Sequence, residues 1–216
     1  RPTLPQRPIR TWQIWNEENF KYFVTRPNPA EYGKLVKLSS AAIKGVDGGA
    51  QIVLGGMFAK PNEARFKLKP PQAYFATDFL DQLYRRPGIK TYFDGIALHP
   101  YAIDARELAE MSEELHEVTL AHHDRVPMYI TEMGWGSQND FEQVAFEQGI
   151  RGQVMQLRDS YARVEGGELW LIGVHIAPYL FAQGFGAVDP ERRRKLLAHR
   201  AEIEEMRERT EQEHLT

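Results

Sequence analysis

The sequence predicts an α/β fold of the (β/α)8-barrel type, and three observations lead to this prediction. Segments with the composition of strands alternate with segments of helical periodicity throughout the 216 residues. The strands are near-continuous apolar runs, which is typical of parallel strands covered by helices. No glycine-rich phosphate turn follows any strand, and this disfavours the alternative of an open doubly wound sheet. No composition change marks a linker, so residues 1–216 are expected to form one domain.

Five strands, each followed by a helix, are expected from the spacing of apolar residues and from the glycines and prolines between them. The expected strands cover residues 11–16, 51–58, 93–101, 126–131 and 169–176, and the expected helices cover residues 30–44, 70–86, 105–124, 141–164 and 191–211. The last helix is strongly charged, and we interpret its charges as a solvated face. Residues 1–10 contain three prolines and are expected to be irregular.

The composition excludes several classes of function. A net charge of -3 and a pI of about 6.2 provide no basic field, so no nucleic-acid partner is expected. No apolar run reaches the roughly 18 residues of a membrane span, so no membrane partner is expected. Cysteine is absent. The cluster His122-His123-Asp124 lies at an expected helix end without a third ligand, so neither a metal nor a cofactor is expected.

Polar side chains recur where successive expected strands end. In a barrel these ends converge on one mouth, which would bring Glu17 and Glu132 together. Hydrolysis of an acetal needs such a pair of carboxyl groups, because one protonates the leaving oxygen while the other attacks the anomeric carbon or activates water. The candidate residues at strand ends are Asn16, Glu17, His99, Tyr101, Glu132 and His175.

Three segments resemble motifs of the clan A retaining glycoside hydrolases, with families 39 and 5 as the nearest types. The segment Trp15-Asn16-Glu17-Glu18-Asn19 resembles W-N-E-P-N after the fourth barrel strand. The segment Ile130-Thr131-Glu132-Met133-Gly134-Trp135 resembles I-T-E-x-G-W after the seventh strand, and His99-Pro100-Tyr101 matches the H-P-Y of family-39-like members at the sixth. The resemblance covers residues 11–175 and implies the C-terminal part of a barrel, from the fourth strand onward, without the first three β-α units.

The resemblance implies a retaining glycoside hydrolase that cleaves β-linked O-glycosidic bonds of a carbohydrate by double displacement. Glu17 would be the acid/base and Glu132 the nucleophile. Glu18 replaces the family's proline, adds a negative charge beside Glu17 and is expected to point the opposite way. The substrate-binding candidates are Asn16 at the sugar 2-hydroxyl, His99 and Tyr101 at Glu132 or the sugar, Trp135 stacked under a sugar ring, and His175 in place of an aromatic residue after the eighth strand. Trp12 and Trp15 are expected in the core.

Two other functions remain open at this point. One is a catalytically inactive or truncated barrel that acts as a carbohydrate-binding or interaction module. The other is a metal-dependent hydrolase that uses His99, His175 and an acid. A barrel without three units has an edge to cover. A preceding segment or a second copy of the chain is expected to complete it, or the fold is an opened remnant of a barrel. Proteins of the resembled type are often exported, which favours an extracellular location.

Overall fold

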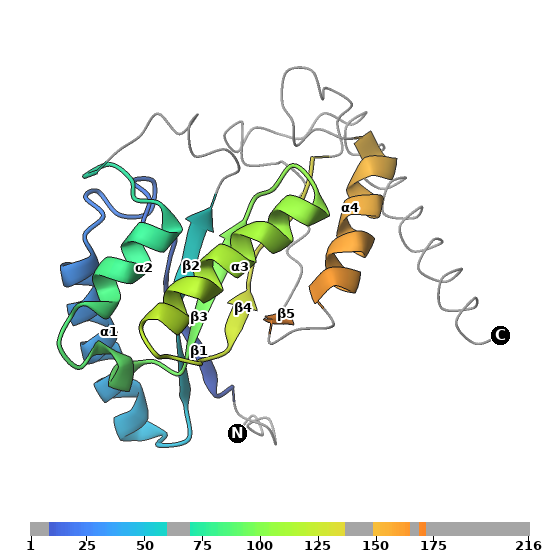
Figure 1. The fold of residues 1–216 in the computed structure, drawn as a ribbon. Helices are drawn as coiled ribbons and strands as arrows, with labels where there is room; N and C mark the ends of the chain where they lie inside the picture. Colours follow the sequence, from blue (N-terminus) through green and yellow to red (C-terminus); the bar gives the residue numbers. More distant parts are fainter. Residues whose placement is uncertain (1–8, 60–69, 137–148, 165–168, 172–216) are drawn as a thin grey trace, which may run out of the picture. The chain divides into compact units, whose positions relative to one another are not determined.

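The computed structural model describes residues 9–59, 70–136, 149–164 and 169–171 (Figure 1). The chain divides into two compact units. The first contains residues 1–134 and 157–176, and the second contains residues 135–156 and 177–216. That residues 1–216 form a single domain stays a prediction.

The strands of the first unit form one parallel sheet, whose order follows the chain. They are β1 (Thr11–Asn16), β2 (Gln51–Ala59), β3 (Gly95–Pro100), β4 (Met128–Ile130) and β5 (Leu169–Leu171), in the order β1-β2-β3-β4-β5. A bulge interrupts the register of β2 with β3 between Val53 and Gly56. The predicted bounds of the first four strands are confirmed to within two residues.

Two of the described helices, the first and the third α-helix, begin at a residue whose side chain caps free backbone donors. The described helices are α1 (Pro29–Val46), α2 (Ala76–Tyr84), the 3-10 helix η2 (Ile89–Tyr92), α3 (Ala105–Ala121) and α4 (Gly149–Val164). The boundary between the two units falls within α4. The side-chain oxygen of Asn28 accepts hydrogen bonds from the backbone N–H of Ala30 (2.9 Å) and Glu31 (3.2 Å), which satisfies two of the free donors of α1. The predicted helix over residues 191–211 lies outside the described residues. None of the described helices is both long and apolar enough to cross a membrane.

The main core lies between the sheet and the layer formed by α1, α2 and α3 (Figure 1). Since each strand pairs with the next one along the chain, right-handed crossovers place the helices on one face of the sheet. Successive residues of a strand therefore point alternately toward the helices and to the opposite face of the sheet. On the central strands, those facing the helices are fully buried, and Val53, Ala97 and Tyr129 form a second, small buried cluster on the opposite face. The residues of the main core include Val36, Ile52, Leu54, Phe79, Leu80, Ile96, Leu98 and Leu115.

The predicted (β/α)8-barrel type of fold was wrong. The described strands make an open five-stranded sheet, in which β1 pairs only with β2 and β5 only with β4 among the described residues. The alternation of strands and helices indicates parallel pairing, but it does not show whether the chain has enough strands to close a sheet into a barrel. The comparisons with known proteins, given below, contradict the barrel as well.

Two glycines of β2 allow side chains to lie directly against the strand on both faces. A Cβ atom on Gly56 would collide with the ring of His99, and one on Gly55 would collide with the carboxyl group of Glu18. Neither of these side chains is at the surface, since Glu18 is 1% and His99 0% exposed. The sequence Gly55-Gly56 is therefore a packing requirement of both faces.

Substitution of Gly56 by alanine is expected to lower the free energy of unfolding by about 1–3 kcal/mol, because the buried His99 ring must move. Gly45 is the matched control. It lies exposed in α1 with no atom within 4 Å of an added Cβ, so Gly45→Ala should raise the free energy of unfolding by roughly 0.5–1 kcal/mol. Urea unfolding followed by circular dichroism measures both effects. Equal stability of Gly56→Ala and the wild type would contradict the packing requirement.

Candidate functional site at the ends of β1, β3 and β4

The end of β1 has an unusual backbone that sends successive side chains in different directions. Trp15 and Glu17 have φ angles of 73° and 45°, in the left-handed region that side chains other than glycine rarely adopt. The backbone N–H of Glu17 donates to the carbonyl of Gly56 at 3.0 Å, which fixes this turn to β2. Glu17 consequently reaches His99, whereas Glu18 lies against Gly55. The expectation that the two glutamates point in opposite ways is confirmed.

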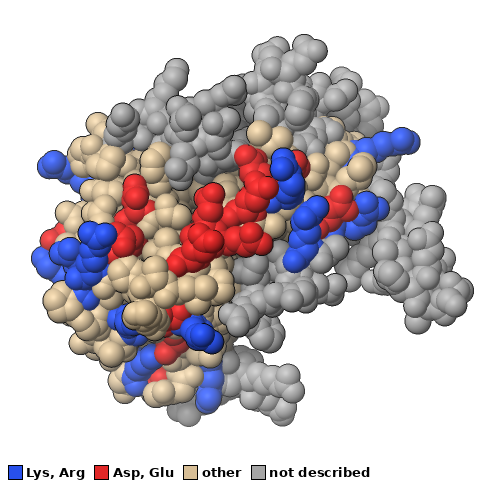
Figure 2. Space-filling view, in the orientation of Figure 1, with Lys and Arg blue, Asp and Glu red and all other residues tan. Residues whose placement is uncertain are grey.

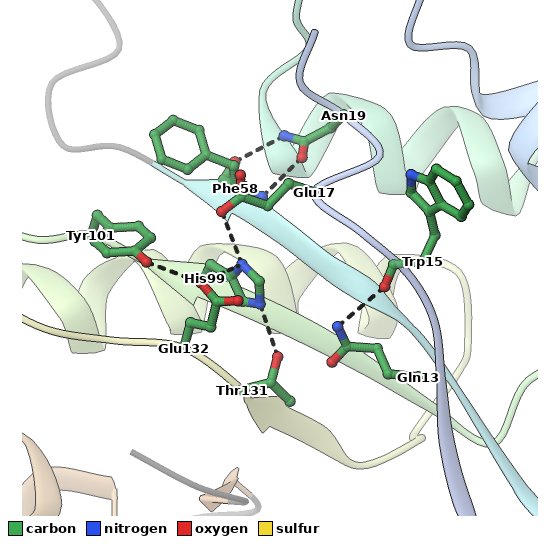
Figure 3. Close-up of polar contacts among 9 residues, drawn as sticks. All are labelled: Gln13, Trp15, Glu17, Asn19, Phe58, His99, Tyr101, Thr131 and Glu132. Atoms are coloured by element: carbon green, nitrogen blue, oxygen red, sulfur yellow. Dashed lines mark hydrogen bonds and ion pairs between the residues drawn. The ribbon is translucent and has the colours of Figure 1, made fainter. Parts of the chain in front are cut away.

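Glu17, His99 and Glu132 form a compact cluster, called here the Glu-His-Glu cluster (Figure 3). The Nδ1 atom of His99 lies 3.0 Å from Oε1 of Glu17 and 3.5 Å from Oε2 of Glu132. The side chains are 8% exposed for Glu17, 0% for His99 and 32% for Glu132. The cluster is thus buried at its centre and reaches solvent through Glu132.

Two hydroxyl groups hold the cluster in place. The hydroxyl of Tyr101 donates to Oε2 of Glu132 at 3.0 Å, and Nε2 of His99 lies 3.0 Å from Oγ1 of Thr131 (Figure 3). Thr131 follows β4 directly and points to the same face as Tyr129, two residues earlier. Thr131 was not among the site residues expected from the sequence, although its place at a strand end next to Glu132 was a usable signal.

Glu18 occupies a different environment from the one expected. Both of its carboxyl oxygens are buried without a hydrogen-bond partner among the described residues. Burial raises the pKa of Glu18 from 4.5 to about 8, and the nearby charge of Glu17 adds to the rise. The expected negative charge beside Glu17 is therefore absent at neutral pH, because the buried carboxyl group keeps its proton. A pocket of about 350 Å³ next to Glu18 is lined by Trp15 and Tyr32 among others, and not by the Glu-His-Glu cluster.

The other predicted site residues are Asn16, Trp135 and His175, of which the structure describes the first two. Asn16 ends β1 in register with Gly56, and none of the described hydrogen bonds links it to the cluster. Trp135 belongs to the second unit, where Nε2 of Gln153 donates to its carbonyl, and His175 lies outside the described residues. The roles predicted for Asn16, Trp135 and His175 stay predictions.

Two tryptophans of β1 do not lie where the sequence predicted them. Trp12 and Trp15 are 44% and 56% exposed, so the expectation that they belong to the core was wrong. Trp12 lies on a strand that pairs on one edge only among the described residues, and the left-handed φ angle of Trp15 turns its side chain outward. Periodicity alone could reveal neither cause.

Asn19 is a structural residue that the sequence analysis did not single out. Its amide accepts from the N–H of Phe58 at 2.8 Å and donates to the carbonyls of Phe58 (2.8 Å) and Tyr74 (2.9 Å). These three hydrogen bonds tie the loop after β1 to β2 and to the segment before α2, and Figure 3 shows the two with Phe58. The available signal in the sequence was an amide side chain directly after two carboxyl side chains.

The comparisons with known proteins give different results for different parts of the chain. Residues 148–216 match the family model described as SmpB protein. An SsrA-binding protein of Oleidesulfovibrio alaskensis is 45% identical over 67 residues, which are 31% of this chain and 43% of that protein. The SsrA-binding protein of Solidesulfovibrio magneticus is 50% identical over 62 residues, 29% of this chain and 40% of that protein. The chain therefore spans about two fifths of the length of these relatives.

Solved structures resemble the chain in fold. A monomeric β-xylosidase from Caulobacter crescentus CB15 gives a TM-score of 0.53 at 14% identity, covering 76% of this chain and 32% of that one. The GH53 catalytic domain of Ignisphaera aggregans gives a TM-score of 0.51 at 17% identity, covering 75% of this chain and 47% of that one. At such low identity the likeness concerns the arrangement of strands and helices alone.

The family match corrects the functional expectations. The matched relatives are named for binding SsrA, an RNA, and they are not glycosidases. The expected clan A glycoside hydrolase family, the hydrolase activity, the carbohydrate substrate and the absence of a nucleic-acid partner were therefore wrong. Short motifs at strand ends were extended to a whole protein. The segment with the family match was interpreted as part of a helix, a strand with the candidate His175, and a charged terminal helix. Glu17, His99 and Glu132 lie outside residues 148–216, and the individual roles predicted for these three residues stay predictions.

The stability of the wild type is expected to fall, relative to Glu18→Gln, as pH rises from about 5 to 8. The unfolded chain releases the proton of Glu18 near pH 4.5, whereas the folded chain keeps it to about pH 8. The folded state binds more protons in this interval, so the free energy of unfolding decreases by up to about 1.4 kcal/mol per pH unit. Glutamine carries no such proton, and the variant should lack this decrease.

Urea midpoints between pH 5 and 8 measure the difference, with the exposed Glu31→Gln as control. Parallel profiles for the wild type and Glu18→Gln would show that Glu18 is ionised in the folded chain.

Proposed function

We propose that residues 148–216 bind the RNA SsrA. The observation that carries this proposal is the match of this segment to the SmpB protein family, together with 45–50% identity to SsrA-binding proteins over 62–67 residues. Identity at this level over a continuous segment supports a shared binding surface better than motifs of five or six residues do. The proposal concerns this segment and not the Glu-His-Glu cluster.

One basic run within the segment supports an RNA partner. Arg192, Arg193, Arg194 and Lys195 are four consecutive basic residues inside the matched range. Such a run can neutralise several phosphates, and guanidinium groups bind phosphate oxygens in a bidentate manner. The net charge of -3 averages this run with acidic residues, several of them in the same segment, so it does not show the basic run.

The described surface of the first unit contrasts with this segment. Figure 2 shows acidic side chains gathered over α3. The exposed residues of α3 include Glu110, Glu113, Glu114 and Glu117. A row of carboxylates repels a phosphate backbone. The face formed by α3 is therefore unsuited to RNA, which favours the matched segment as the place of binding.

Alanine at Arg192, Arg193, Arg194 and Lys195 together is expected to weaken binding of SsrA RNA by the full chain at least tenfold near 0.1 M salt. The slope of log K against log salt should also decrease by about 0.7 for each lost phosphate contact to single-stranded RNA. Fluorescence anisotropy with labelled SsrA RNA measures both quantities. The control substitutes four exposed basic residues of the first unit, Lys21, Arg26, Arg86 and Arg125.

A second control uses an unrelated RNA of equal length. The proposal requires the chain to prefer SsrA over this RNA and requires the first-unit control to bind like the wild type. Equal affinity for both RNAs, or equal losses in the two quadruple variants, would contradict a specific SsrA-binding segment.

A further inference from the structure

We propose that Glu17, His99 and Glu132 form a binding site for one divalent transition-metal ion, with Zn²⁺ as the preferred ion. One ligand atom of each residue lies within 4.8 Å of the ligand atoms of the other two. The residues come from the ends of β1, β3 and β4, which the parallel sheet brings together. The site is independent of the proposed RNA binding, since all three residues lie outside residues 148–216.

The geometry around one ring nitrogen is the main argument. Nδ1 of His99 faces two carboxylate oxygens, one from Glu17 at 3.0 Å and one from Glu132 at 3.5 Å. A ring nitrogen carries at most one proton, which can be directed to only one of the two carboxylates. A metal ion in place of this proton would interact with the nitrogen and with both carboxylates at once. The arrangement thus matches a cation better than it matches a single hydrogen bond.

The second nitrogen of His99 has the partner that a metal-binding histidine needs. Nε2 lies 3.0 Å from the hydroxyl of Thr131. When Nδ1 binds the ion, Nε2 carries the proton and donates it to Thr131, which fixes the tautomer and the ring orientation. Tyr101 holds the carboxylate of Glu132 in the same manner, with its hydroxyl 3.0 Å from Oε2.

Burial and access favour binding from one side. His99 and Glu17 are enclosed, so the surroundings oppose two neighbouring negative charges and favour a cation between them. Glu132 is 32% exposed in its side chain, and its side of the cluster is open to an entering ion and to water as a further ligand. One imidazole and two carboxylates form a donor set that suits Zn²⁺ and Mn²⁺, and Zn²⁺ binds more tightly in the general order of affinities.

The sequence places these three residues at strand ends but does not identify them as one set of ligands. The cluster His122-His123-Asp124 was judged to lack a third ligand, and the metal-dependent alternative combined His99 with His175 and an acid. The nearest pair of proposed ligands, His99 and Glu132, is separated by a complete β-α unit that contains α3. The structure instead pairs His122 with Asp81 at 2.9 Å.

The test is isothermal titration of the metal-free 216-residue chain with Zn²⁺ at neutral pH. The wild type is expected to bind one ion at this site, and Glu132→Gln is expected to weaken that binding at least tenfold. Glu132→Gln is the main variant because its partly exposed, isosteric side chain should leave the fold intact, which circular dichroism verifies. Glu110→Gln, on the exposed face of α3, is the matched control and should bind like the wild type.

Other histidines of the chain can bind Zn²⁺ weakly, so a second measurement identifies the ligands. The visible absorption of bound Co²⁺ should appear with the wild type and with Glu110→Gln, and should be lost or shifted with Glu132→Gln. Thr131→Val keeps all three ligands and removes the partner of Nε2, so it should weaken Zn²⁺ binding by a factor of about 10 to 100. Unchanged Zn²⁺ affinity and Co²⁺ absorption in Glu132→Gln, or no binding by the wild type, would overturn the proposal.

Discussion

The close packing of side chains against Gly55 and Gly56 is the constraint on which the described sheet depends. On one face the carboxyl group of Glu18 lies against Gly55, and on the other the ring of His99 lies against Gly56. Two buried polar groups are thereby placed on opposite sides of one strand. The position of His99 then determines where Glu17 and Glu132 meet. A side chain at Gly55 would displace Glu18, and a side chain at Gly56 would displace His99 and so disturb the cluster.

The sequence was sufficient to place the strands and most helices. Apolar runs and helical spacing indicate local structure directly, and parallel strand ends meet at one edge, so the proximity of Glu17, His99 and Glu132 could be expected. The left-handed backbone at Trp15 and Glu17 could not, because it depends on the contact of Glu17 with β2. The raised pKa of Glu18 likewise results from burial that no local pattern records.

The match to the SmpB family could not be inferred from the strand-end motifs, because these motifs describe only one edge of a sheet. The motifs around Glu17 and Glu132 are short, and solved structures of similar fold share only 14–17% of the sequence. The informative segment was residues 148–216, which has 45% identity to an SsrA-binding protein over 67 residues. Composition concealed it, since the basic run at Arg192 is balanced by acidic neighbours and by the row of glutamates on α3.

The strand order has a consequence for how the chain folds during synthesis. Each described strand after β1 pairs with the described strand that precedes it in the sequence, so none of these four pairings waits for a later part of the chain. As the ribosome releases each β-α unit, the edge on which its strand must dock is already formed. The sheet can therefore grow by one strand at a time, and Gly55-Gly56 is in place on β2 before His99 is made.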